Sequence, residues 1–149
     1  MSASPASHGR VLLVALTPES RTALGASRAE IERFPYRVGR ESRGIQRTAQ
    51  GFMSERRSPG SRPSNDLYLV EHDEPMNVSR AHFHIDRDDS GGYVLVDRES
   101  TCGTIVEGDV VGGGTRGGTV ALHDGDVIIV GTSNSPYVFK FRISGTATP

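Results

Sequence analysis

The sequence predicts an all-β fold, a sandwich or a barrel built from short strands. Three observations support this prediction. Short apolar or alternating runs recur along the chain, clusters of turn-forming residues separate them, and the 149 residues include 18 glycines and 8 prolines. So much backbone punctuation in so short a chain indicates many turns between short strands. Regularly spaced strands of this kind are typical of β-sandwiches and β-barrels.

The first strand is expected at Val11–Leu16, an apolar run that is far too short to cross a bilayer. Residues 1–9 are small and polar, so we expect a disordered tail there. The segment Thr17–Arg33 leaves two interpretations open. Residues Ser27–Glu30 are either the capping box of a helix or the turn and second strand of an irregular sandwich. The next strand, Phe34–Val38, leads into a Gly-Arg pair.

Residues 41–64 differ in composition from the rest of the chain. They contain five arginines but few apolar residues. A segment that can bury so little apolar area does not repay the entropy of ordering it. We therefore predict a long surface loop or a disordered insertion, within a single domain that spans residues 10–143. Loops of this length are usually functional or mobile.

The second half of the chain alternates between strands and turns. In Ala81–Asp86, His82, His84 and Asp86 are expected on one face and the two apolar residues on the other. The glycine-rich run Gly112–Gly118 is interpreted as a flexible hairpin, and residues 144–149 as a disordered tail. The expected strands are Asp66–Val70, Ala81–Asp86, Tyr93–Val96, Thr104–Val106, Val110–Val111, Thr119–Leu122, Asp126–Val130 and Val138–Ile143.

Composition narrows the possible partners and the compartment. The net charge of -1 gives the whole protein no electrostatic reason to coat nucleic acid or an anionic membrane. The single cysteine, Cys102, excludes an intrachain disulfide and a cysteine-based zinc site. No secretory cleavage site follows the first apolar run. We therefore expect a cytoplasmic protein that needs no metal or other cofactor.

Four short motifs occur in a fixed order at the expected strand ends. They are Gly39-Arg40, Val78-Ser79-Arg80-Ala81-His82-Phe83, Asp97-Arg98-Glu99-Ser100-Thr101-Cys102-Gly103-Thr104 with Val106-Glu107-Gly108, and Leu122-His123-Asp124-Gly125-Asp126-Val127-Ile128-Ile129-Val130-Gly131. No single motif is specific, but four in the right order are informative together. Together they resemble the signature of the forkhead-associated (FHA) family, over roughly Val11 to Ile143.

The resemblance implies a β-sandwich of about eleven strands with recognition loops at one end. It implies a phosphothreonine-containing peptide or protein as the partner, in Ser/Thr kinase signalling. Arg40 would supply a cation to the phosphate, Ser79 and Thr101 would donate hydroxyl hydrogen bonds, and Arg80 would flank the pocket. His82 would brace the loop without touching the ligand. A phosphate dianion needs several charge-assisted donors, and the planar fork of arginine matches its geometry.

The sequence departs from the family pattern at three places. Cys102 stands where the family has an asparagine that binds the peptide backbone, and a thiol is a weak donor and acceptor. One lost bond of this kind costs about 0.5–3 kcal/mol. Glu107 stands where the family usually has asparagine, and its charge would repel phosphate if it faced the site. The arginine-rich insertion 41–64 follows Arg40 where the family has a shorter loop.

Three alternatives stay open at this point. The chain could be a degenerate FHA domain that acts as a phospho-independent scaffold, as the Cys102 substitution suggests. The arginine-rich segment could bind nucleic acid, although Phe52 is its only aromatic residue and a stacking platform is therefore absent. His82, His84 and Cys102 could be imagined as a metal or thiol site. No carboxylate pair, Ser-His-Asp order or P-loop accompanies them, so we do not expect an enzyme.

Overall fold

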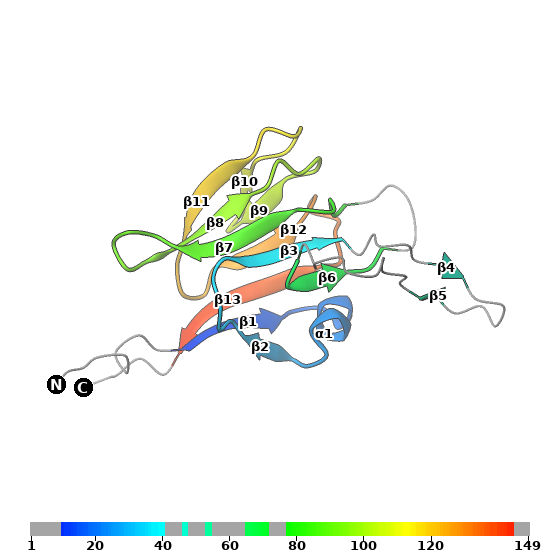
Figure 1. Ribbon diagram of the computed structural model, residues 1–149, viewed down its shortest axis with the longest axis horizontal. Coiled ribbons are helices and arrows are strands. Elements are labelled where there is room, and N and C mark those ends of the chain that lie inside the picture. Colours follow the sequence, from blue (N-terminus) through cyan, green and yellow to red (C-terminus); the bar gives the residue numbers. More distant parts are fainter. Residues whose placement is uncertain (1–9, 41–45, 48–52, 55–64, 72–76, 145–149) are drawn as a thin grey trace, which may run out of the picture.

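The structure is a computed structural model that describes residues 10–40, 46–47, 53–54, 65–71 and 77–144. Two sheets pack face to face in these residues (Figure 1). The larger is antiparallel, and the smaller is mixed because β3 and β6 are parallel. The six-stranded sheet has the order β10-β9-β12-β13-β1-β2, and the five-stranded sheet has the order β11-β8-β7-β3-β6. The predicted all-β sandwich of about eleven strands is confirmed.

The strands of the six-stranded sheet are β1 (Arg10–Ala15), β2 (Arg28–Glu30), β9 (Thr104–Val106), β10 (Asp109–Val111), β12 (Val127–Val130) and β13 (Val138–Ser144). Those of the five-stranded sheet are β3 (Tyr36–Arg40), β6 (Leu67–Leu69), β7 (Phe83–Arg87), β8 (Tyr93–Asp97) and β11 (Gly118–Leu122). The strands expected from the sequence lie at these positions, with small differences at their ends.

The core lies between the two sheets and is filled by the inward side chains of both. Phe139 and Phe141 of β13 are fully buried, as are Phe83 and Ile85 of β7. On β7 the alternation expected from the sequence is confirmed for the strand itself, because its intervening residues are only half-buried. His82 is the exception. It precedes the strand and is fully buried, so its placement on the polar face was wrong.

The segment between β1 and β3 contains a helix that the sequence analysis did not anticipate. Helix α1 (Pro18–Leu24) begins after Thr17, whose hydroxyl accepts the backbone N–H of Ser20 at 3.1 Å. It ends at Gly25, whose left-handed backbone (φ 75°) is easiest for glycine. The residues suspected of capping a helix form strand β2, which pairs with β1. Of the two interpretations of this segment, the strand is therefore correct.

The glycine-rich run does not form a hairpin. β10 lies at the edge of the six-stranded sheet and β11 at the edge of the five-stranded sheet, so the residues between them cross from one sheet to the other. Gly112 has a φ of 74°, and a Cβ there would lie 2.4 Å from Oδ1 of Asp97. The expected hairpin was wrong because composition reports turn-forming residues but not the sheet in which the next strand pairs.

Several expectations fall largely outside the described residues. They concern the tail at 1–9, most of the 41–64 insertion and the tail after Ser144. Within the insertion, β4 (Gln46–Arg47) and β5 (Met53–Ser54) are described as a two-stranded antiparallel ribbon. In the part of the chain that the structure describes, no helix is long and apolar enough to cross a membrane.

The strand order gathers four chain segments at one end of the five-stranded sheet. Arg40 at the end of β3 is in register with Leu69 of the parallel strand β6. Phe83 at the start of β7 pairs with Asp97 at the end of β8. The ends of β3, β6 and β8 and the start of β7 therefore lie at the same end of the sheet. The paired ends of β1 and β13 lie on the opposite side of the molecule (Figure 1).

Candidate functional site

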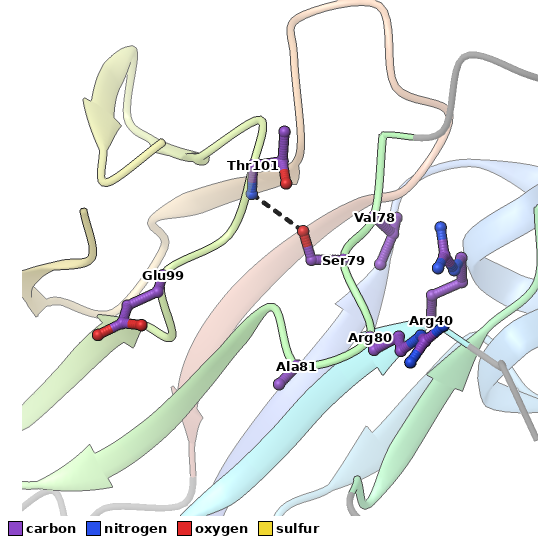
Figure 2. A pocket seen from close by; sticks show the side chains of 7 residues that line it. All are labelled: Arg40, Val78, Ser79, Arg80, Ala81, Glu99 and Thr101. Carbon is purple, nitrogen blue, oxygen red and sulfur yellow. Dashed lines mark hydrogen bonds between the residues drawn. The ribbon is translucent and has the colours of Figure 1, made fainter. Parts of the chain in front are cut away.

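An open pocket of about 490 Å³ lies at this end of the five-stranded sheet. Its lining comes from the end of β3, the segment before β7 and the loop after β8 (Figure 2). Four of the five predicted ligand-binding residues, Arg40, Ser79, Arg80 and Thr101, therefore meet in one place although they come from three distant segments of the sequence. The described lining residues are Arg40, Val78, Ser79, Arg80, Ala81, Glu99 and Thr101.

The two arginines supply the positive charge of the pocket. The Arg40 backbone N–H donates to the Ser79 carbonyl at 2.9 Å, which fastens the end of β3 to the segment before β7. Arg40 is half-buried and Arg80 is exposed. Among the residues that the structure describes, no hydrogen bond or ion pair engages either guanidinium group. Both charges are therefore available to an anion in the pocket.

Gly39 allows the end of β3 to lie close to the segment before β7. A Cβ at this position would lie 1.9 Å from the Arg80 carbonyl oxygen, a backbone atom. It would also lie 2.6 Å from the amide nitrogen of Asn65. The glycine of the Gly-Arg pair is therefore needed for the close contact between two backbones, and this contact sets the position of both arginines.

Ser79 and Thr101 present hydroxyl groups from two different loops. The Thr101 backbone N–H donates to Oγ of Ser79 at 3.0 Å (Figure 2). Since the Ser79 oxygen accepts this bond, its own hydroxyl hydrogen is left to point elsewhere. The Thr101 residue is exposed beside it. The pair therefore provides two O–H donors at one wall of the pocket.

The buried His82 links the same two loops by hydrogen bonds. Its Nδ1 accepts the backbone N–H of Ser79 at 2.9 Å, and its Nε2 lies 2.7 Å from the Gly103 carbonyl oxygen. Because a backbone N–H can only donate, the proton of a neutral ring must lie on Nε2, which donates to Gly103. Burial lowers the pKa of His82, so the neutral form is favoured. The bracing role implied by the family resemblance matches these contacts.

Asp97 anchors the loop that carries Thr101, and the sequence analysis gave it no role. Its buried carboxylate accepts the Ser100 N–H at 2.8 Å, the Ser100 hydroxyl at 2.6 Å and the Thr104 hydroxyl at 2.8 Å. The Ser100 oxygen in turn accepts the Gly103 N–H at 2.9 Å. A signal was present, because an aspartate followed by hydroxyl residues in a short turn favours such local bonds.

A second set of contacts holds the segment before β7. The buried Asn65 amide donates to the Arg80 carbonyl at 2.7 Å and accepts from the Arg98 guanidinium at 2.9 Å. The Glu71 carboxylate accepts the N–H groups of Asn77 and Val78, both at 2.9 Å. Nothing in the sequence pattern points to these residues, because their partners are distant in the chain or belong to the backbone.

Cys102, Glu107 and Glu99 differ in their relation to the pocket. Cys102 is half-buried beside Thr101, and the described lining of the pocket does not include it. Oε2 of Glu107 accepts the Val127 N–H at 2.8 Å, so this carboxylate is engaged by β12. The repulsion considered for Glu107 belongs instead to Glu99, which lines the pocket and which the sequence analysis missed.

Comparison with known proteins agrees with this geometry. The FHA domain family model matches residues 56–131, just over half of the chain. No match was found among curated protein sequences.

Similar folds occur in solved structures of low sequence identity. EmbR of Mycobacterium tuberculosis, in complex with a low-affinity phosphopeptide, is 21% identical with a TM-score of 0.54 over 95% of this chain, which spans only 26% of EmbR. The FHA domain of the CT664 protein from Chlamydia trachomatis is 20% identical, with a TM-score of 0.55 over 91% of this chain and 98% of that one.

The kinase-interacting FHA domain of kinase associated protein phosphatase from Arabidopsis is 21% identical. Its TM-score is 0.58, over 95% of this chain and 98% of that one. At these identities the solved structures establish the fold, and the family model, which matches just over half of the chain, establishes the family: the chain belongs to the FHA domain family.

Proposed function

We propose that the protein is a binding module that recognises phosphothreonine in a partner protein, as part of Ser/Thr kinase signalling. The observation that carries the proposal is the convergence on one open pocket of two hydroxyl groups and two guanidinium groups that no described residue engages. A phosphate dianion offers several acceptor oxygens at once, and charge-assisted bonds are about twice as strong as neutral ones. We place the interaction in the cytoplasm.

The pocket suits a phosphate carried by an extended chain. It is open on its outer side and formed by loops, so a peptide could lie across it without entering a deep cavity. The loops themselves are held by Gly39, His82 and Asp97, so few donors need to be ordered when the ligand binds. Pre-ordered donors reduce the entropic cost of association. EmbR, with a similar fold, is seen in complex with a phosphopeptide.

The test is a titration by fluorescence anisotropy with three matched peptide pools, carrying phosphothreonine, phosphoserine or unphosphorylated threonine. We expect binding to the phosphothreonine pool and a loss of roughly tenfold or more in Arg40→Ala, since a hydrogen bond to a charged group contributes about 1.5–3 kcal/mol. Arg10→Ala is the matched control, because Arg10 is paired with Glu30 in the six-stranded sheet and neither residue is among the described lining of the pocket.

A second candidate is a scaffold that binds without phosphate, motivated by Cys102 in the place of the family's asparagine. The same titration separates the two candidates. Equal binding of all three pools, with Arg40→Ala folded and unaffected, would refute the phosphothreonine proposal and favour the scaffold. Binding that needs the phosphate and weakens only in Arg40→Ala would exclude the scaffold.

A further inference from the structure

The pocket carries charges of both signs. Arg40 and Arg80 lie toward one side of it, and the Glu99 carboxylate lies on the other side, beyond Ser79 and Thr101 (Figure 2). A ligand that carried only negative charge would be attracted at one side and repelled at the other. A ligand with an anion and a nearby cation would match both sides.

Glu99 is presented by a rigid part of the chain. Its neighbours are fixed because Ser100 donates its N–H to Asp97 and accepts the Thr115 N–H at its own carbonyl oxygen, at 3.1 Å. Glu99 itself has a φ of 63°, in the left-handed region that residues with a Cβ rarely adopt. The backbone therefore fixes where this side chain leaves the loop, and it does so at a conformational cost.

The Glu99 carboxylate does not stabilise the described part of the fold. Among the described residues, it makes no hydrogen bond and no ion pair, and the residue is exposed. Three other carboxylates differ in this respect. Asp97 and Glu71 bind backbone N–H groups of the loops, and Glu107 binds that of Val127. Glu99 is thus the acidic group of the pocket that is free to meet a ligand.

We infer that Glu99 is a specificity-determining residue that selects phosphothreonine peptides with a lysine or arginine close to the phosphothreonine. The inference rests on the proposed function. It specifies in addition the charge of a peptide residue close to the phosphothreonine. Residues of an extended peptide are about 3.3 Å apart, so a side chain within three residues of the phosphothreonine starts within about 10 Å of it. The same carboxylate disfavours peptides with aspartate or glutamate at that position.

The experiment uses one neutral phosphothreonine peptide in which each of the three positions before and after the phosphothreonine is replaced in turn by lysine, norleucine or glutamate. Norleucine keeps the length of lysine without its charge. At low salt we expect lysine to bind about two- to fivefold more tightly than norleucine at one position, the range of an exposed ion pair. The preference should weaken as salt is added.

Two variants assign the preference to Glu99. Glu99→Gln should bind the norleucine peptide at least as well as the wild-type protein and lose the lysine preference. Glu99→Lys should favour the glutamate peptide instead. Glu107→Gln is the matched control, because Glu107 is also an exposed carboxylate with a positive φ (49°) but is absent from the described lining of the pocket. Thermal unfolding of each variant verifies that it is folded.

The outcomes separate this inference from the proposed function. Phosphothreonine-dependent binding without any lysine preference, or with a preference that Glu99→Gln retains, overturns the inference and leaves the proposed function standing. If the wild-type protein binds none of the phosphorylated peptides at 50 mM salt or below, both are refuted. A lysine preference that disappears in Glu99→Gln and persists in Glu107→Gln supports both.

Discussion

At the scale of single residues, the pocket depends on side chains that never touch a ligand. Gly39 contributes by having no side chain, because the Arg80 carbonyl occupies the space that a Cβ would need. His82 contributes as a neutral ring that links two backbone groups in opposite loops. The pocket therefore requires that position 39 has no Cβ and that the ring of His82 is neutral.

Gly39→Ala should destabilise the protein and weaken phosphopeptide binding. The added Cβ would lie 1.9 Å from a backbone oxygen, so β3 or the segment before β7 must move. Overpacking of this kind costs about 1–3 kcal/mol. Urea unfolding measures the loss. The control is Gly92→Ala, where the nearest atom, at 2.9 Å, is a carboxylate oxygen of Asp88 and not a backbone atom. Equal stability of the two variants would contradict the prediction.

The stability of the protein should fall as the pH falls below 6.5. Burial lowers the pKa of His82 below its ordinary value of 6.5, so the unfolded chain takes up a proton that the folded ring resists. The contribution of His82 is therefore fully present above pH 6.5 and is lost as the pH falls toward the lowered pKa. Burial also lowers the pKa of His84, which adds an effect of the same sign.

Urea unfolding at pH values from 7 to 5 measures this dependence, and the difference between wild type and His82→Gln isolates the share of His82. NMR titration of the ring protons provides a second measurement that needs no variant. The same ring in the urea-unfolded protein serves as the reference. A His82 ring that titrates alike in the folded and unfolded protein, or a stability that stays constant over this range, would show that the prediction is wrong.

At the scale of elements, the loop between β8 and β9 is held by its own hydrogen bonds. Asp97 ends β8 and Thr104 begins β9, and both lie in the network that also fixes Ser100. The glycine-rich segment adds an outer support, since the N–H of Gly114 donates to the Thr101 carbonyl at 2.8 Å. The strand ends and the crossing segment together therefore determine where Thr101 lies.

Asp97→Asn should lower stability and weaken phosphopeptide binding together. The carboxylate accepts three donors, and an amide in its place turns one acceptor oxygen into a donor that faces hydroxyl or N–H groups. Leaving such a buried group unsatisfied costs about 1–3 kcal/mol. Thermal unfolding and peptide titration measure the two effects. Asp109→Asn, at an exposed position of β10, is the control. Unchanged affinity in a destabilised Asp97→Asn would mean that the network does not position Thr101.

At the scale of the whole molecule, the sandwich separates its two ends. The strand order brings the segments around β3, β6, β7 and β8 to one end, and the described chain enters and leaves at the other (Figure 1). A rigid two-sheet core thus carries binding loops, an arrangement common where recognition is the task. The described core is continuous across both sheets, so the loops rest on one packed unit.

Much of this architecture could be predicted from the sequence because its signals are local. The alternation of Phe83 and Ile85 with polar residues predicts a half-buried strand, and turn residues such as Glu107-Gly108 mark a tight hairpin. The four motifs indicate the family and suggest Arg40, Ser79, Arg80 and Thr101 as neighbours. These features follow from residue type and spacing, which the chain carries whether it is folded or not.

Other features were decided only by the tertiary structure. The glycine-rich segment crosses between sheets, His82 turns inward, and Asn65 braces Arg80 from fifteen residues away. Glu99, to which the motif gives no role, lies in the pocket. The reason is physical. A period of two residues tells which side chains share a face, but which strands pair and which distant backbones meet depends on long-range packing that no local pattern records.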